Sequence, residues 1–328
     1  MIKSKLRRAL LYGLSAALPW AIGTAAQAQE NYPNKPITLL VGSAPGGSND
    51  TFARALAKRL EESWGQSVIV DNRPAVGGVL ANAMVAKANP DGYTLVVLSS
   101  TFTTVAAIQK NLQYDAYNDF APVAMMAKGP LFLAVGPDAP FKDVQGLVDY
   151  AQKNPGKVNY GTSGVGSILN FATEHFISAA NVKMSHVPYK SGAPALTDLM
   201  GGHIQMMIGS IPSFAGPAKA GKIRMLAVTS AKRFPTYPEL PSLEELGYKG
   251  SAVEVWWGVL APAGTPEPIV EKLNAEISKI IHTDSMKEFL LQESAEPASM
   301  KPAEFASYIK QEIDRWKGVV ETKGIQSQ

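Results

Sequence analysis

The stretch "ITLLVGSAPGGSNDTFARALAKRL", residues 37–60, places a glycine-rich turn between an apolar run and a helical pattern. The apolar run is typical of a buried strand, and Phe52, Leu56 and Leu60 recur at the four-residue spacing of one helix face. Such a turn offers backbone N–H groups to an anion, because the first N–H groups of a helix have no internal partner. It has neither the Gly-x-Gly-x-x-Gly motif for a dinucleotide nor the lysine of a phosphate loop, so the sequence leaves the anion open.

The alternation of strand and helix patterns continues on both sides of residue 128. "SVIVDNR" predicts a strand, "GGVLANAMVAKA" a helix and "YTLVVLSS" another strand. After "APVAMMAKGPLFLAV" the pattern restarts with a helix, an Asn-Pro-Gly turn, a strand and a second glycine-rich turn. Two final helices are predicted, with apolar stripes that begin at Ile269 and Phe305. The alternation predicts an α/β fold of mostly parallel, doubly wound sheets, and the length suffices for two domains.

The two glycine-rich turns resemble each other. Residues 42–52 and 161–171 share a glycine, four residues, Gly-Ser, three residues and a phenylalanine. Chance similarity between glycine-rich turns is the alternative explanation. If the similarity is functional, two similar domains each supply one anion-binding turn, because ligands of such sheets bind beyond the carboxyl ends of the strands.

Residues 1–28 have the three-part layout of a secretory signal peptide, with cleavage expected after Ala28. A basic head precedes a mostly apolar run over residues 9–22, and Ala26-Gln27-Ala28 closes the segment. A membrane anchor is the alternative, but the run is short for a span and contains Pro19. No later apolar segment is long and uncharged enough to cross a bilayer, so we expect a soluble mature protein in the periplasm.

Charge and cysteine content exclude several classes of function. The chain has 31 Lys and Arg against 28 Asp and Glu, a net charge of +3. Removing the four basic residues of the leader leaves 27 basic and 28 acidic side chains, a net charge of −1, so nothing indicates a nucleic-acid partner. The absence of cysteine excludes disulfides, thiolate metal sites, a cysteine nucleophile and a lipid-modified N-terminal cysteine.

Motifs for catalysis are also missing, so we predict no catalytic residue, no metal and no cofactor. "GTSGVG" does not match the Gly-x-Ser-x-Gly nucleophile elbow, because Val165 follows Gly164. The histidines have no metal-binding spacing; they are His175, His186, His203 and His282. Residues at the turns keep two interpretations at this stage. Ser48 and Ser167 are helix N-caps or ligand donors, and Asp50 is a first-turn acid or a ligand acceptor.

Longer motifs resemble the periplasmic solute-binding proteins of the tripartite tricarboxylate transporter family, the Bug group. The resemblance covers nearly all of the predicted mature chain. It rests on "YPNKPITLLVGSAPGGSND", "VIVDNRPAVGGVLANAMVAKANPDGYTLVVLSS", "KNPGKVNYGTSGVGS", "VPYKSGAPALTDLMGGHIQMMIGSIPS", "AGKIRMLAVTSAKR" and "WWGVLAPAGTPEPIVEKLNAEI". It implies a Venus-flytrap fold of two α/β domains: residues 29–127 with 251–328, and residues 128–250.

The resemblance also implies a ligand carboxylate held between the two turns by backbone N–H groups, hydroxyls and waters. The ligand-binding residues that it implies come from the first turn, a strand end, the second turn and the "PYK…ALTDL" motif. They are Ser43, Gly46, Gly47, Ser48, Asp50, Ser99, Ser100, Thr101, Thr162, Ser163, Gly164, Gly166, Ser167, Tyr189 and Asp198. For Asp198 the alternative is a role as a cap or turn partner.

Two departures from the family pattern bear on the choice of ligand. Ser43 and Ala44 stand where an aromatic residue and a proline are common, and the smaller pair leaves more room. Phe102 replaces a common histidine and either lines the cleft or packs in the core.

These observations favour a periplasmic receptor that closes around a small carboxylate and delivers it to inner-membrane transporter subunits or to a sensor. We expect a monomer. An exported hydrolase-like enzyme on a similar two-domain fold and a scaffold without a ligand are the alternatives. The sequence leaves the ligand open among dicarboxylates, tricarboxylates, acidic amino acids, and nicotinate-like and other aromatic carboxylates.

Overall fold

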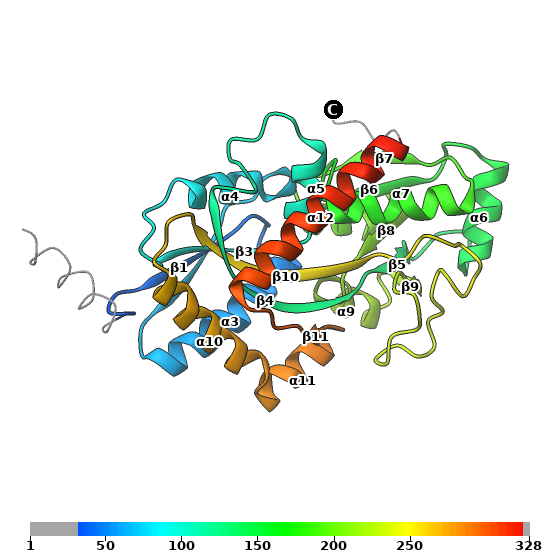
Figure 1. The fold of residues 1–328 in the computed structure, drawn as a ribbon. Coiled ribbons are helices and arrows are strands. Elements are labelled where there is room, and N and C mark those ends of the chain that lie inside the picture. Colours follow the sequence, from blue (N-terminus) through cyan, green and yellow to red (C-terminus); the bar gives the residue numbers. More distant parts are fainter. Residues whose placement is uncertain (1–31, 324–328) are drawn as a thin grey trace, which may run out of the picture.

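The computed structural model describes residues 32–323, so the predicted signal peptide lies outside the described residues. Two β-sheets, each with its own helices, lie side by side (Figure 1). The first sheet has the order β11 (Glu296–Pro297), β4 (Phe120–Pro130), β10 (Glu254–Pro262), β3 (Thr94–Ser99), β1 (Ile37–Val41), β2 (Val68–Asn72). The second has the order β7 (Ser185–Pro188), β6 (Asn159–Thr162), β8 (Met206–Gly209), β5 (Phe132–Val135), β9 (Arg224–Val228).

The predicted α/β fold is confirmed, but both sheets are mixed rather than mostly parallel. Strands β1, β2 and β3 are parallel to one another, as are β6, β7 and β8. In the first sheet β10 and β11 pair antiparallel to their neighbours, and in the second sheet β5 does so. The strand–helix alternation predicted the parallel strands correctly. It missed the antiparallel ones because strands that cross between sheets need no helical connection.

Helices follow the parallel strands and cover the sheets. Those after the first three strands are α3 (Ser48–Trp64), the short helix η1 (Val76–Gly78) with α4 (Val79–Ala86), and α5 (Thr101–Ile108). Those of the second sheet are α6 (Val144–Lys153), α7 (Ile168–Ala180), α8 (Gly192–Met200) and α9 (Ile211–Lys219). The C-terminal part has α10 (Glu267–Ile281), α11 (Asp284–Gln292) and α12 (Pro302–Lys323), so one more helix than the two predicted.

Three segments join the two halves of the molecule. Strand β4 of the first sheet continues almost directly into β5 of the second, and β10 returns the chain to the first sheet (Figure 1). Helix α12 packs on both halves: Phe305 contacts Trp256 on β10, and Trp316 contacts Phe171 on α7. The predicted domain boundaries are close to these crossings and stay a prediction.

The phenylalanines that end the two similar stretches are core residues. Phe52 and Phe171 are both fully buried. The Phe52 ring stacks on Trp257 of β10 with 4.2 Å between ring centroids, so helix α3 is fixed against the centre of the first sheet. Each glycine-rich turn is therefore followed by a helix with an aromatic anchor in its first turns.

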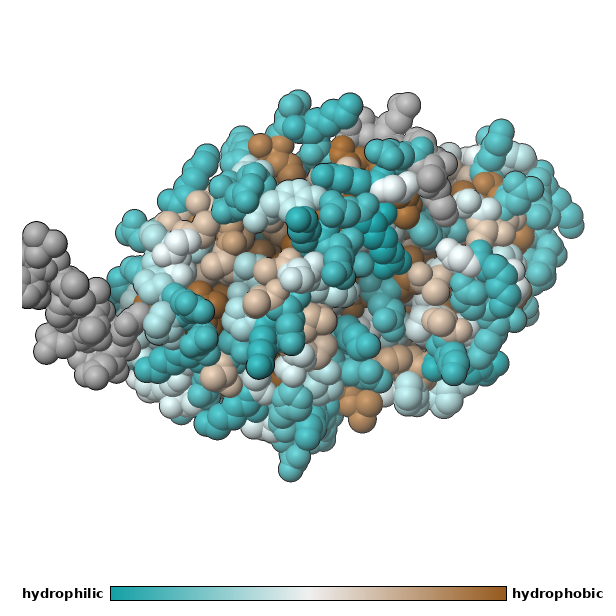
Figure 2. All heavy atoms as spheres, viewed as in Figure 1, coloured by the Kyte–Doolittle hydropathy of each residue, from teal (hydrophilic) through white to brown (hydrophobic). Residues whose placement is uncertain are grey.

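Figure 2 shows a mostly hydrophilic face on which the hydrophobic residues are scattered in small groups. Within residues 32–323, no helix combines the length and the apolar character that a bilayer crossing requires.

Substituting Phe52 tests this anchor. Phe52→Ala removes a fully buried ring and should destabilise the fold by about 3–5 kcal/mol, since the rigid surroundings of α3 and β10 cannot fill the cavity. The check is the midpoint of urea unfolding followed by circular dichroism. Leu291→Ala on α11, where the side chain is 51% exposed, is the control and should change the midpoint little. Equal effects of the two substitutions would contradict the anchoring role.

Candidate functional site

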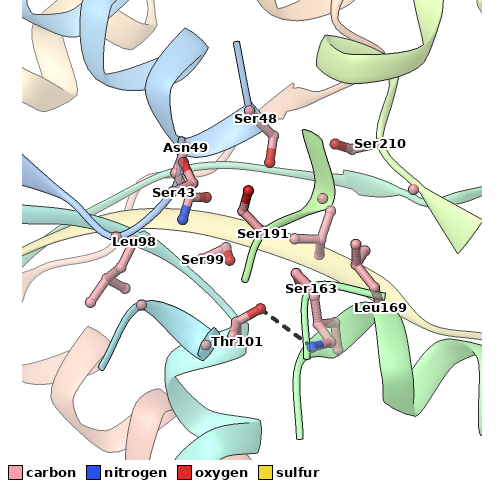
Figure 3. Close-up of a pocket in the computed structure, with 18 of the residues that line it drawn as sticks. Ser43, Ser48, Asn49, Leu98, Ser99, Thr101, Ser163, Leu169, Ser191 and Ser210 are labelled. Carbon is pink, nitrogen blue, oxygen red and sulfur yellow. Dashed lines mark hydrogen bonds between the residues drawn. The ribbon is translucent and has the colours of Figure 1, made fainter. Parts of the chain in front are cut away.

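One pocket lies where the carboxyl ends of six parallel strands meet (Figure 3). Because β1, β2 and β3 run in the same direction, the turns that leave them lie at one sheet edge, and the same holds for β6, β7 and β8. The pocket encloses about 800 Å³, including space open to solvent. Its polar lining is Ser43, Ser48, Asn49, Asn82, Ser99, Thr101, Ser163, Lys190, Ser191, Ser210 and Ser213.

Six helices begin at this pocket. Residues at the start of α3, α4, α5, α7, α8 and α9 all belong to its lining; they are Ser48, Gly78, Thr101, Ile168, Gly192 and Ser210. Each helix N-terminus carries N–H groups that have no partner within the helix backbone, and about half a positive charge. No acidic side chain belongs to the lining, and its one charged residue is the exposed Lys190. The electrostatic environment therefore favours an anion.

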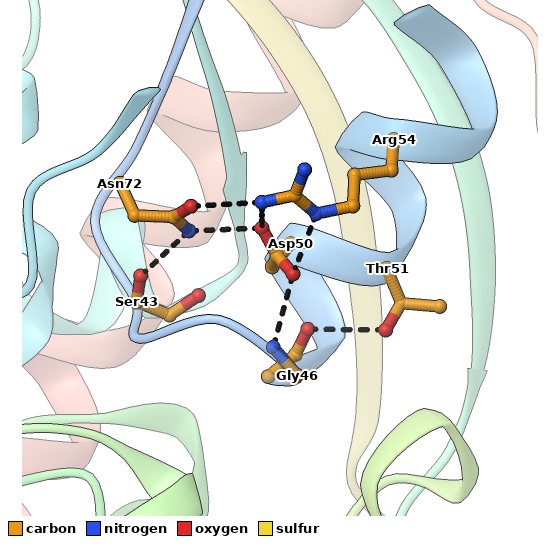
Figure 4. Close-up of polar contacts among 7 residues, drawn as sticks. Ser43, Gly46, Asp50, Thr51, Arg54 and Asn72 are labelled. Carbon is orange, nitrogen blue, oxygen red and sulfur yellow. Dashed lines mark hydrogen bonds and ion pairs between the residues drawn. The ribbon is translucent and has the colours of Figure 1, made fainter. Parts of the chain in front are cut away.

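The buried carboxylate of Asp50 stabilises the first glycine-rich turn by hydrogen bonds (Figure 4). The Asp50 side chain accepts hydrogen bonds from Gly46 N at 3.0 Å, from Asn72 Nδ2 at 2.9 Å and from Arg54 Nε at 3.0 Å. Asn72 Nδ2 also donates to the Ser43 carbonyl at 3.1 Å. Burial alone would raise the pKa of the Asp50 carboxyl, but the hydrogen bonds and the charge of Arg54 outweigh it and lower that pKa.

Asp50 is therefore a support of the turn. It does not line the pocket, and its charge is paired with Arg54 at 2.9 Å, so it does not repel an anion held on the other side. The structure thus favours the structural interpretation of Asp50, which the sequence left open.

The second turn is stabilised mostly by its own hydroxyl groups. Ser167 caps α7, since its Oγ accepts from Asn170 N at 3.2 Å and donates to the Gly164 carbonyl at 2.7 Å. The fully buried Thr162 accepts from Gly164 N at 3.1 Å and lies 2.7 Å from His186 Nε2. Burial lowers the pKa of His186, which favours the neutral form of the ring.

The pocket brings together six of the fifteen residues proposed as ligand contacts. These are Ser43, Gly47, Ser48, Ser99, Thr101 and Ser163. The other nine lie outside the lining: Gly46, Asp50, Ser100, Thr162, Gly164, Gly166, Ser167, Tyr189 and Asp198. For all fifteen, contact with a ligand stays a prediction.

The carboxylate of Asp198 is occupied within the protein. It accepts the hydroxyl hydrogen bond of Tyr189 at 2.6 Å, and burial together with this carboxylate raises the pKa of Tyr189 to about 12. The alternative role of Asp198 as a turn partner therefore fits the structure better than a place in the pocket.

Sequence reasoning missed the pocket-lining residues in the turns after β2, β7 and β8, although it had proposed Tyr189, which directly follows β7. These turns contribute the small residues Gly77 and Gly78, the pair Lys190 and Ser191, and the group of Ser210 and Ser213. Ser210 follows "HIQMMIG", which was predicted as a strand, so the rule that chose the two glycine-rich turns could have found it. Strand β7 is short and only half-buried, and it gave no such signal.

Two of the residues that depart from the family pattern, Ser43 and Phe102, line the pocket. Phe102 lines it and also packs on Phe120 at 5.2 Å between ring centroids, so both of its predicted roles hold. Ser43 lines it with a buried hydroxyl that has no hydrogen-bond partner among the described residues. Figure 3 shows Ser43 and Asn49 on the wall that the first turn forms.

Comparison with known proteins agrees with this architecture. Residues 52–325 match the family model described as the tripartite tricarboxylate transporter family receptor. The chain belongs to this family. The Bordetella pertussis protein BugT is 33% identical over 297 residues, which are 90% of this chain and 91% of BugT.

Two solved structures are also similar to this chain. Rpa4515 of R. palustris with adipate is 37% identical with a TM-score of 0.87, over 90% of this chain and 99% of that one. MatC (Rpa3494) of Rhodopseudomonas palustris with bound malate is 31% identical with a TM-score of 0.82, over 88% and 100%. The family consists of periplasmic solute-binding receptors, and both structures share the two-sheet fold of this receptor.

The charge of Asp50 should appear in the pH dependence of stability. A carboxyl whose pKa is lowered by folding adds stability above its unfolded pKa and loses it as pH falls through the folded pKa. Asp50→Asn should therefore show a smaller loss of melting temperature than the parent between about pH 6 and about pH 3. Glu271→Gln, which removes an exposed carboxyl of α10, should keep the parental slope. A parental slope for Asp50→Asn as well would contradict the assigned role of Asp50.

Proposed function

We propose that this protein is a periplasmic receptor that captures a small carboxylate in the pocket between its two sheets. One observation carries the proposal: six helix N-termini and a set of neutral hydroxyls surround a pocket that has no acidic side chain in its lining. Backbone N–H groups at helix starts bind carboxylates without the help of an arginine. That adipate and malate occupy relatives of the same fold supports this class of ligand.

Capture involves closure of the two halves around the ligand. Contacts across the pocket are already present, since Ile168 N donates to Thr101 Oγ1 at 3.3 Å and Gly77 N to the Ser163 carbonyl at 3.4 Å. Both bonds join elements of different sheets, so they break when the halves separate. A ligand held by both walls favours the closed state by its higher affinity for that state.

The chain is exported by a signal peptide cleaved after Ala28 and works as a monomer whose two domains comprise residues 29–127 with 251–328 and residues 128–250. It binds without catalysis and passes the ligand to inner-membrane transporter subunits or to a sensor. Membership of a receptor family that is named for its transporter supports this last step.

A thermal-shift screen tests the ligand class. Mono-, di- and tricarboxylates, acidic amino acids and aromatic carboxylates are compared with the matching amides or alcohols. A ligand at a thousand times its Kd stabilises the folded state by about 4 kcal/mol, which is a clear rise in melting temperature. At least one carboxylate should raise it while its amide does not. A panel in which no carboxylate acts, or in which the neutral analogues act equally, would contradict the proposal.

Two serines at helix starts should contribute directly to the affinity. Ser191 and Ser210 precede α8 and α9, line the pocket and make no side-chain cap bond, so their hydroxyls are available to the ligand. Ser191→Ala and Ser210→Ala should each weaken binding by about 10- to 100-fold, the loss expected for one hydrogen bond to a charged group. Isothermal titration with the strongest ligand of the panel measures the change.

Ser167→Ala is the matched control. It removes a real N-cap outside the pocket lining and should lower stability by about 1 kcal/mol while the affinity changes far less. If Ser167→Ala weakened binding more than Ser191→Ala and Ser210→Ala, the assignment of the walls would be wrong.

A further inference from the structure

The glycines of the second turn face side chains from the opposite half of the molecule. A Cβ atom added to Gly166 would lie 2.5 Å from Ile108 Cγ2 at the end of α5. A Cβ atom added to Gly164 would overlap Val76 Cγ1 on η1. Both side chains belong to the first-sheet half, and both glycines belong to the second-sheet half. Each glycine therefore leaves a space that a side chain of the other half fills.

The first turn has no such arrangement. A Cβ atom added to Gly46 would meet nothing within 4 Å. One added to Gly47 would meet only Ser43 and Ala44 of the same turn. The two turns are similar in sequence, yet only the second accepts side chains from across the pocket.

We infer that Val76 and Ile108 are positioning residues for ligand capture, and that Gly164 and Gly166 are their sockets. The two side chains enter the sockets only when the halves approach, so they set the distance and orientation at which the pocket closes. The hydrogen bond between Gly77 N and the Ser163 carbonyl joins the residues next to Val76 and Gly164, so it holds this pair in register. The second turn thus serves closure more than direct contact with the ligand.

A methyl group added at Gly164 or Gly166 should strongly disfavour the closed state. Ile108 is 4% exposed and β-branched, so its Cγ2 cannot easily rotate away from an added methyl group. Val76 is 37% exposed, so its truncation disturbs the core of its own half very little. A methyl group on either glycine would therefore hold the halves apart, and removal of the facing side chain would make room again.

The inference deepens the proposed closure and can be tested without any ligand. The chain has no cysteine, so Ser48→Cys on α3 and Ser213→Cys on α9 would supply the sole pair of thiols. Both positions line the pocket, from opposite halves. The rate at which a short bis-maleimide cross-links them reports how often the halves close. Circular dichroism and the melting temperature confirm that each variant is folded.

In this background, Gly166→Ala should slow cross-linking by about tenfold, the effect of disfavouring the closed state by one methyl-sized overlap. Gly166→Ala combined with Ile108→Ala should restore the parental rate. A second, independent test uses the exposed side chain of Val76. Gly164→Ala should slow cross-linking, and its combination with Val76→Ala should restore the parental rate. Gly164 and Gly166 have φ angles of +103° and +82°, so alanine there also strains the backbone. Gly202→Ala is the control for this strain, since Gly202 has a φ of +76° and nothing within 4 Å of an added Cβ atom. This variant should cross-link at the parental rate.

Four results would overturn the inference. The first is a parental rate for both Gly164→Ala and Gly166→Ala, and the second is failure of both double variants to recover. The third is equal slowing by Gly202→Ala, which would assign the effect to strain. No cross-linking in the parent would show that the closed contact does not form. Because no carboxylate is used, these outcomes are independent of whether the ligand panel succeeds.

Discussion

Parallel pairing of three strands in each sheet is the constraint on which the pocket depends. The register of β1 with β2 and β3, and of β6 with β7 and β8, brings six strand ends to two facing edges. Each strand leads through a short turn into a helix, so six helix starts converge on one space. The antiparallel strands β4, β5 and β10 then connect the two edges and keep them opposite each other. The direction of the parallel strands thus places the positive end of each of these helices at the pocket.

The same arrangement explains how a chain with near-neutral predicted mature charge can hold an anion. Acidic side chains are excluded from the lining, and the nearest structural acid of the first turn, Asp50, is buried behind it and neutralised by Arg54. Dipoles and hydroxyls are rigidly attached to the backbone, so they bind with little loss of side-chain entropy. Such a lining constrains the charge of a ligand more strongly than its shape, which suits a family whose members bind different carboxylates.

The two similar turns have different surroundings, and we propose that one serves recognition and the other closure. The first turn presents Ser43, Ser48 and Asn49 to the pocket on a framework fixed by Asp50 and Asn72. The second turn presents Ser163, and its glycines face Val76 and Ile108 of the other half. Similar sequences therefore have different tasks, because one turn is surrounded by its own residues and the other meets the opposite wall.

The sequence by itself determined the α/β class, the positions of both glycine-rich turns and the helix face that begins at Phe52. Those features depend on local periodicity and turn chemistry, which neighbouring residues encode. The tertiary structure alone decided that Asp50 faces away from the pocket, because its partner Asn72 comes from the adjacent strand. It also decided that Ser191 and Ser210 join the walls and that side chains of the other half fill the spaces at Gly164 and Gly166. Contacts between distant segments follow from strand register and from the packing of two halves, and neither is written in any local pattern.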